Sequence, residues 1–443
     1  MENSDLELGS GDHVDMIQLR LDYHVENEAR HRNQSSPSIF MVPSRLRDVS
    51  PNSFNPRVVS IGPLHKDDVN VQAFEGQKSC YLIYLMNRIK NSSKEEVWKT
   101  CMQKAYTLMN KIKACYVWPE TMSYSDAEIA EMMVIDACFI LEFTYQPVYD
   151  KESLYLKDEL QYKSVMDDLV LLENQIPLFF LNEIYHCTIL KFDSHASLIK
   201  LIHELLHGKI SNFIFSTTLE ININDNSISS ANHILSLLHQ CYMPRDDMKE
   251  VRLGSRIHSA IDLDMAGVKL KPSNETENPT WVMGIEMKQN RFPYRPTLVM
   301  PKLKVRDSTE FLLRNLIAYE QSLKTKMYFT SYSNAMNMLV NTQEDVAKLV
   351  DSEVLVNLMG SNEEAANMIN NLGKNVRAHT FYEEEWKKLN KYCKGYWPKH
   401  IARVRSTYFQ SRWSVIALLA GIILFVLQVV QTIFTILSSG RNM

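Results

Sequence analysis

Two histidines and a glutamate near the middle of the chain have the spacing of a zinc-enzyme motif. Residues 203–207 read His-Glu-Leu-Leu-His, which matches H-E-x-x-H. In that motif two histidines on one helix face bind zinc and the glutamate polarises water. A catalytic zinc also needs a third protein ligand. The G-x-x-H extension is missing after His207, and Glu220 lies beyond the helix end expected at Gly208. A metal-dependent hydrolase that uses His203 and His207 is therefore the alternative interpretation. The leading interpretation assigns no catalytic residue, no metal and no cofactor.

A second group that could do chemistry is a stripe of carboxylates. At about 100° per residue, four acidic side chains fall on one face of an expected helix: Glu128, Glu131, Asp136 and Glu142. They could hold a metal or another cation, or they could form a polar stripe at the edge of the core with Arg or Lys partners. The second reading is favoured because metal sites usually add His or Cys ligands. The sequence contains no phosphate-binding glycine loop, serine-hydrolase motif or kinase motif.

Local signals show how these groups must be positioned. Ser125 and Glu128 form a capping box, so a helix is expected to begin there. That helix is apolar almost all round, which predicts a place at the centre of the core. Pro177 interrupts the segment Ser164–Cys187. Residues 173–175 are therefore expected in an elbow between two helices, with a new helix starting at Pro177. Capping of exposed amides is the expected role of these three residues.

The fold class follows from the order of periodic segments. Helical patterns run over about Val71–Lys90, Trp98–Cys115, Ala231–Gln240 and from Asp307 onward. Between them, strand-like patterns with turn residues occupy Gly267–Lys271, Trp281–Lys288 and Thr297–Val305. We expect a mainly α-helical (α+β) globular domain with a small antiparallel β-sheet near 267–305. The polar stretch Ser211–Ser230 is expected to be a solvent-facing loop.

Composition limits the function classes. The 443 residues are 45% hydrophobic and 23% charged, with a formal net charge of -4. This is typical of a globular protein, and it gives no basic stripe for nucleic acid. The seven cysteines are odd in number and include no C-x-x-C pair. This favours reduced, buried thiols and a cytosolic environment. The first twenty residues are acidic and lack the apolar core of a signal peptide.

A long uncharged stretch near the end of the chain predicts a transmembrane helix. Trp413–Leu437 contains no Asp, Glu, Lys or Arg. As a helix it would be about 37 Å long, against a hydrocarbon core of about 30 Å. A buried core helix is the disfavoured alternative. Basic residues precede the stretch at Lys394, Lys399, Arg403, Arg405 and Arg412, and Arg441 follows it. By the positive-inside rule this arrangement places the large N-terminal part in the cytosol, with the anchor in the plasma membrane or an endomembrane.

The expected organisation has five parts. A polar tail with a short helix at Val14–Ala29 occupies 1–37, and the globular domain occupies 38–393. A basic juxtamembrane segment (394–412), the membrane helix (413–437) and a short tail (438–443) follow.

Several long motifs occur in an order that resembles a known family. The chain reads FMVPSRLRDVSPNSFNPRVVSIGPLH, FEGQKSCYL, EMMVIDACFILE, DLVLLENQIPLFFL, RNLIAYEQ and a terminal apolar segment. These are similar to the plant domain-of-unknown-function 247 family over about residues 38 to 437. The resemblance implies a C-terminal membrane anchor and no established catalytic activity. It also allows a part in grass self-incompatibility, where some members are pollen-side determinants. Lys66 after His65, and Ala137 before Cys138, depart from the family pattern.

Polar residues inside these motifs are the candidate site. They are Arg45, His65, Glu75, Lys78, Asp136, Glu173, Asn174, Gln175, Arg314, Asn315 and Glu320. They could converge on a ligand, or they could form buried hydrogen-bonded pairs that fix how helices and loops meet. The structural role is favoured. We therefore expect a membrane-tethered recognition or signalling protein, whose partners are the lipid bilayer and a protein that the sequence does not identify. The oligomeric state is not indicated.

Overall fold

The structure is a computed structural model of the chain. It describes residues 37–119, 122–151, 158–210, 214–216, 225–244, 248–252, 254, 258–273, 281–289, 295–323, 325–395 and 412–439. The expected helix Val14–Ala29, the tail 438–443 beyond Ser439, and most of the polar stretch Ser211–Ser230 lie outside these residues. The end of that stretch is described, and it forms a short helix, α10 (Asp225–Ser230).

The described residues belong to two compact units, where the sequence predicted one globular domain. Unit 1 comprises the described residues within Met1–Ile210, Glu220–Cys241 and Arg314–Leu323. Unit 2 comprises those within Ser211–Leu219, Tyr242–Leu313 and Lys324–Met443. Each unit is described by itself below.

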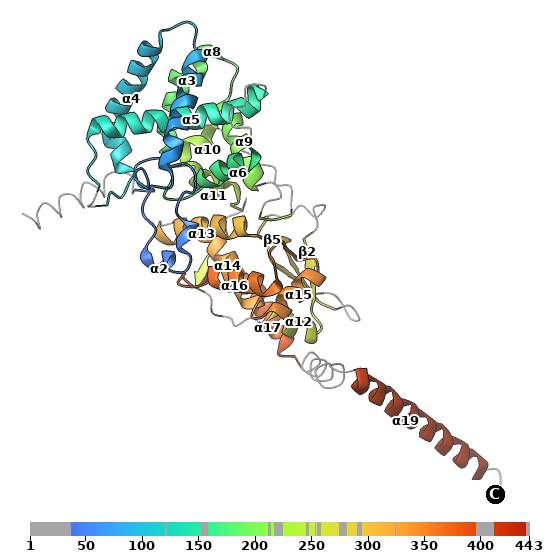
Figure 1. Cartoon of the computed structure of the whole chain (residues 1–443). Helices are drawn as coiled ribbons and strands as arrows, with labels where there is room; N and C mark the ends of the chain where they lie inside the picture. The colour runs from blue at the N-terminus through green and yellow to red at the C-terminus, as the bar shows by residue number, and fades with distance from the viewer. Residues whose placement is uncertain are drawn as a thin grey trace, which may run out of the picture. The chain divides into compact units, whose positions relative to one another are not determined.

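Unit 1 is helical. Its elements are α2 (Ser44–Arg47), η1 (Pro51–Ser53), η2 (Gln72–Phe74), α3 (Glu75–Arg88), α4 (Lys94–Ala114), α5 (Asp126–Tyr149), α6 (Glu159–Asp168), α7 (Leu178–Cys187), α8 (Ile189–Phe192), α9 (Leu198–Ile210), α10, α11 (Ile234–Cys241) and the second half of α13 (Asp307–Ser322). Helices α3, α4, α7 and α9 all pack against α5 (Figure 1). The prediction that this helix lies at the centre of the core is confirmed, because almost every side chain from Ile129 to Gln146 is buried.

The start of α5 follows the sequence signal. The Ser125 hydroxyl accepts the Glu128 N–H, and the Glu128 carboxylate accepts the Ser125 N–H at 2.7 Å. The predicted capping box is therefore present. The elbow at Pro177 is also present, with one difference: Pro177 is the N-cap and α7 begins at Leu178. At φ −61° and ψ 131°, Pro177 is still extended, so the first helical residue is the next one.

Unit 2 mixes helices with short strands. Its elements are β1 (Val251–Arg252), α12 (Ala260–Met265), β2 (Lys269–Pro272), β3 (Glu286–Lys288), β4 (Thr297–Met300), β5 (Leu303–Val305), the first half of α13, α14 (Tyr328–Leu339), α15 (Gln343–Asp351), β6 (Leu355–Asn357), α16 (Asn362–Leu372), β7 (His379–Thr380), α17 (Glu383–Cys393) and α19 (Arg412–Ser439).

The sheet near 267–305 is mixed, so the prediction of an antiparallel sheet is wrong in part. Strand β4 pairs with β3 antiparallel and with β2 parallel. The stretch expected as one strand over Thr297–Val305 is two strands, because Pro301 has no N–H to donate and β4 ends before it. After the break, β5 pairs in parallel with β6 in a different sheet. Strand pairing order depends on partners far along the chain, which local periodicity cannot specify.

An aromatic cluster fills the core of unit 2. The rings of Tyr328 and Phe381 stack with centroids 4.8 Å apart, and those of Trp281 and Tyr382 stack at 5.7 Å. Trp386 packs edge-on against Tyr382 at 5.9 Å. Two polar atoms of the cluster are hydrogen-bonded: Trp281 Nε1 donates to the carbonyl of Tyr242, and the Tyr382 hydroxyl donates to the carbonyl of Met283.

The C-terminal helix α19 has 28 residues, Arg412–Ser439. Its described side chains, which lie at 416 and 419–433, are all exposed. Among the residues that the structure describes, we find no helix with enough length and apolar character to cross a membrane. The predicted span over Trp413–Leu437 is therefore not confirmed, and it stays a prediction.

Candidate functional site

A buried loop in unit 1 organises the candidate site. Residues 57–62 form neither helix nor strand, although Val59 and Ser60 are fully buried. Backbone N–H groups in such a loop need acceptors that a helix or sheet would otherwise supply. The Asp168 carboxylate accepts three of them, from Arg57, Val58 and Val59, at 2.7–3.0 Å. The loop is thus held from α6 by one carboxylate.

Two further side chains accept backbone N–H groups of the loop. Asn174 Oδ1 accepts the Ile61 N–H at 2.6 Å, and its Nδ2 donates to the carbonyls of Val59 and Asp168. Asp136 Oδ2 accepts the Gly62 N–H at 2.8 Å. Burial raises the pKa of Asp168 to about 6, although its three backbone donors act in the opposite direction.

A buried lysine ties this loop to two helices. Lys78 on α3 has no exposed surface. Its ammonium group donates to the Ser60 carbonyl at 2.9 Å and lies 2.6 Å from carboxylate oxygens of both Asp136 and Glu75. Burial disfavours the charged amine, but the two carboxylates outweigh it, so the pKa of Lys78 is raised. Glu75 also pairs with Lys66. The ammonium group thus has two hydrogen bonds and a further ion pair with Glu75.

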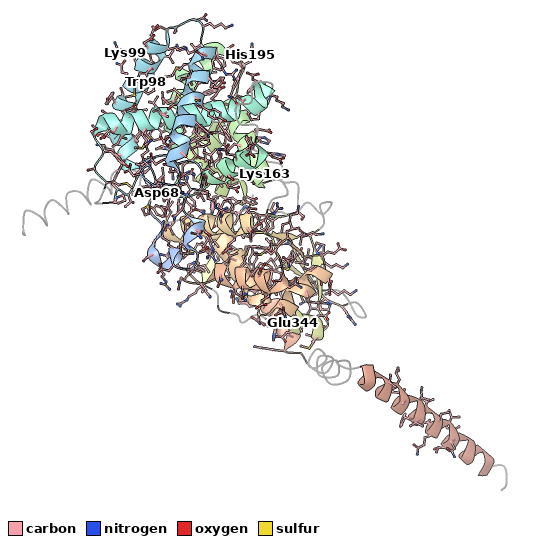
Figure 2. All side chains as sticks on the ribbon, in the orientation of Figure 1. Asp68, Trp98, Lys99, Lys163, His195 and Glu344 are labelled. Atoms are coloured by element: carbon pink, nitrogen blue, oxygen red, sulfur yellow. The ribbon has the colours of Figure 1, made fainter. Side chains whose placement is uncertain are left out.

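Glu173 forms the second ionic centre. Its carboxylate accepts the N–H of Val42 and pairs with Arg47 and with His65 Nε2, the last at 2.8 Å. The other ring nitrogen of His65 lies 2.7 Å from Asp68, which is labelled in Figure 2. Because both ring nitrogens face carboxylates, the arrangement favours the doubly protonated, positively charged imidazole. Burial disfavours this charge, but the bonds to Glu173 and Asp68 outweigh it, and the pKa of His65 is raised above 6.5.

The Gln175 side chain holds the elbow in place through hydrogen bonds to backbone groups. Gln175 Nε2 donates to the carbonyls of Leu169 and Leu171, and Oε1 accepts the Leu235 N–H. The carbonyl of Gln175 faces Gly62, where a Cβ would lie only 2.7 Å from it, and Gly62 has φ +74°. Only glycine fits both the dihedral angle and this close approach. The predicted capping role of residues 173–175 agrees with these contacts.

Three predicted residues lie on the second half of α13. Asn315 accepts the Leu172 N–H at 2.9 Å and donates to the Ser53 carbonyl at 2.7 Å. Glu320 pairs with the buried His239 at 2.9 Å. Arg314 is buried. The contacts of Asn315 and Glu320 extend the polar interior of unit 1 beyond the ionic groups around Lys78 and Glu173.

One predicted residue is misplaced and three were missed. Arg45 is exposed on α2, and the arginine that pairs with Glu173 is Arg47. The spacing of the motif SRLRDV does not show which arginine points inward. Asp168 and Asp68 were also missed. Asp168 lies in the same DLVLLENQ motif as Glu173, which is the signal that could have found it.

We name this set the buried polar network, comprising Arg47, His65, Lys78, Asp136, Asp168, Glu173, Asn174 and Gln175. Its charged groups face one another or backbone groups within the described residues, and no group of three or more described His, Cys, Asp or Glu residues could hold a metal ion. The geometry is that of a brace between loop 57–65, α3, α5 and the elbow.

Comparison with known proteins decides the family. The model of the DUF247 family, described as plant protein of unknown function, matches residues 39–427.

The chain belongs to the DUF247 family.

Two UPF0481 proteins of Arabidopsis thaliana are similar to this DUF247 chain. One is 24% identical over 96% of this chain and 95% of its own length, and the other is 26% identical over 91% and 87%. No solved structure matches. Family membership is thus shown, and the function of the family is unknown.

The H-E-x-x-H segment of this DUF247 protein does lie on a helix. His203 and His207 are on α9, with ring centroids 5.7 Å apart, and Glu204 is exposed. The described residues supply no third ligand beside them. The two histidines therefore have the spacing of the motif, but the described residues do not complete a zinc site.

The carboxylate stripe on α5 is divided among different partners. Glu128 accepts the N–H and the hydroxyl of the N-cap Ser125, Asp136 pairs with Lys78, and Glu142 pairs with Arg88 at 2.8 Å. Glu131 is exposed. The favoured reading, a polar stripe with Lys and Arg partners, agrees with these contacts for Asp136 and Glu142.

Proposed function

We propose that this DUF247 chain is a membrane-tethered recognition protein, anchored through Trp413–Leu437, with its two units on the cytosolic side. The observation that carries the proposal is the exposed apolar surface of α19. Leu424, Phe425 and Leu427 are each more than half exposed. A helix with this much apolar surface in water is unfavourable, and lipid or a partner removes it from water.

The sequence extends this support beyond the described side chains. Described side chains of α19 end at Ile433, whereas the uncharged stretch runs from Trp413 to Leu437. The basic residues before the stretch outnumber those after it, which supports a cytosolic N-terminal body. All seven cysteines are free thiols, and reduced cysteines are usual in the cytosol.

Substitutions in α19 test the anchor. The full chain is expressed in plant cells, and membranes are pelleted and washed with alkaline carbonate. We expect the native chain in the pellet. Leu424→Lys with Leu427→Lys should move it to the supernatant, because lysine at the centre of a bilayer helix is costly. Leu424→Ala with Leu427→Ala is the matched control and should stay in the pellet. Native protein in the supernatant would reject the anchor.

The contacts of the buried polar network support a structural role for its residues, and the proposed recognition would then use other parts of the chain. The network's acidic and basic groups bind one another, so substitution should act on stability before it acts on binding. Glu173→Ala should lower the free energy of unfolding by about 1–3 kcal/mol, because buried donors lose their acceptor. If the variant lost a membrane partner captured in mild detergent while its melting temperature was unchanged, the network would be a binding site.

A role in self-incompatibility would be one form of this recognition function, and its support is the family resemblance alone. The zinc-hydrolase alternative has one observation in its favour, the two neighbouring imidazoles on α9. Metal analysis of the purified chain separates the two functions: stoichiometric zinc that is lost in His203→Ala would favour the hydrolase, and native-level zinc in that variant would reject this site.

A further inference from the structure

A hollow in unit 2 is lined mainly by basic side chains. It has a volume of about 770 Å³ and lies along the C-terminal half of α17 (labelled in Figure 1). Small-molecule sites have volumes of about 300–1,000 Å³. The wall includes Lys387, Lys391, Lys394, Asn390, His258 and Gly254. The buried polar network belongs to the other unit and contributes nothing to it.

The lysines share one face of α17 and its end. Positions 387, 391 and 394 follow the i, i+4, i+7 spacing, so their side chains lie within a narrow arc. Lys388 is not among the lining residues and pairs instead with Glu385 at 2.6 Å. Basic residues at a helix C-terminus favour the helix dipole. The dipole does not account for His258, which comes from the segment before α12 and faces the same hollow.

The local charge is not balanced by described acids. Lys387 pairs with Glu384 at 2.9 Å, and Glu383 accepts the Gly254 N–H at one side. Lys391 and Lys394 form no ion pair with any described residue. Lysines that line one hollow without counter-charges make its electrostatic potential positive, and a bound anion lowers that potential.

We propose that this hollow binds a phosphate-bearing anion, held by Lys391 and Lys394 with Lys387, Asn390 and His258 around it. Phosphate has several charged oxygens and can accept from separate ammonium groups at once, which a single carboxylate does less well. The volume leaves room for a group attached to the phosphate. Both a free phosphorylated molecule and a lipid headgroup offer this chemistry. The site does not depend on the anchor proposed above.

Lysine footprinting of the full chain in detergent micelles tests the site. Amine-reactive labelling is followed by mass spectrometry with and without two probes. The first probe is inorganic pyrophosphate, and the second is phosphatidylinositol 4-phosphate added to the micelles. We expect slower labelling of Lys391 and Lys394 with one or both probes. Lys388 on the same helix and Lys163 on α6, labelled in Figure 2, should label at unchanged rates.

The response to each probe identifies the source of the anion. Protection by pyrophosphate supports a free phosphorylated ligand, and protection by the lipid alone supports a headgroup. Lys391→Gln with Lys394→Gln should weaken binding by at least about tenfold, since each lysine supplies a charge-assisted bond. Both lysines are exposed, so the melting temperature should not change. Lys163→Gln is the matched control. The proposal is overturned if neither probe slows the labelling of Lys391 and Lys394. It is also overturned if the double variant binds the probes as tightly as the native chain.

Discussion

The buried centres of the two units differ in the chemistry of their side chains. In unit 1 the centre holds ions: Lys78, Asp136 and Glu173 are each at most 1% exposed. In unit 2 the centre holds aromatic rings, and Trp386, Tyr328 and Tyr382 are buried to a similar degree. The named side chains are thus buried to a similar degree in both units, but they are ionic in unit 1 and aromatic in unit 2.

One source of the difference is how the irregular backbone of loop 57–62 in unit 1 is hydrogen-bonded. No described strand pairs with loop 57–62 of unit 1, and Asp168, Asn174 and Asp136 accept N–H groups of this loop. The buried Asp136 carboxylate is in turn paired with the Lys78 ammonium group. In unit 2, short strands pair part of the irregular backbone, as β5 does with β6. One buried carboxylate there, Asp345, also accepts backbone N–H groups, from Ile261, Asn341 and Thr342. At loop 57–62 of unit 1, buried polar side chains accept N–H groups that have no helix or strand partner among the described residues.

The strongest test of this comparison removes the buried lysine. Lys78→Met should lower the free energy of unfolding by about 3–5 kcal/mol, because Asp136 would remain buried without its cation. Hydrogen exchange of the full chain should rise across residues 57–62 and stay unchanged around Trp281. In the double variant Lys78→Met, Asp136→Leu, part of the loss should be recovered. A small loss in the single variant would show that the ion pair is not needed.

The counterpart in unit 2 is Phe381→Ala. It should lower the free energy of unfolding by about 3 kcal/mol, because the stacked contact with Tyr328 becomes a cavity. Calorimetry at about pH 6 and about pH 8 should give the same loss, since no titratable partner is removed. A loss that changed strongly with pH would contradict the contrast between an ionic and an aromatic core.

The charge on His65 makes unit 1 sensitive to pH. Its pKa is raised in the fold, so its stabilising contribution is complete below the unfolded value of about 6.5. That contribution is lost as pH rises through the higher folded pKa, because the folded protein then releases the proton that stabilised it. His65→Gln should remove this decline in denaturation curves measured above neutral pH. The neutral His233, whose pKa burial lowers to about 3, is the control: His233→Gln should leave the decline in place. A decline that persists in His65→Gln would assign it to another group.

The smallest expected effects concern helix caps, which should not distinguish the units. Ser125→Ala at α5 and Ser259→Ala at α12 each remove a capping box. Each should cost about 1 kcal/mol, because the cap acts on local N–H groups. Urea denaturation checks both variants, with Ser→Thr at the same positions retaining most of the cap. A much larger loss at only one cap would mean that it also depends on the core beside it.

Local sequence signals specified much of the fold and part of the candidate site. The capping box at Ser125, the apolar helix after it and the elbow at Glu173–Gln175 depend on neighbours a few residues away, and all are present. Predicted polar positions such as His65, Lys78 and Asp136 are buried. The sequence selected Arg45 where the structure uses Arg47, because two arginines two residues apart differ only in direction.

The sequence by itself determined the helical class, the family and the uncharged stretch at Trp413–Leu437, because each is a property of local composition or of motif order. Only the tertiary structure decided which charges meet. Lys78 reaches Asp136 across 58 residues and His65 reaches Glu173 across 108. It also decided that β4 pairs with β2 in parallel. Such pairings are set by the packing of distant segments, where burial makes every unpaired polar group costly, and no local pattern records that cost.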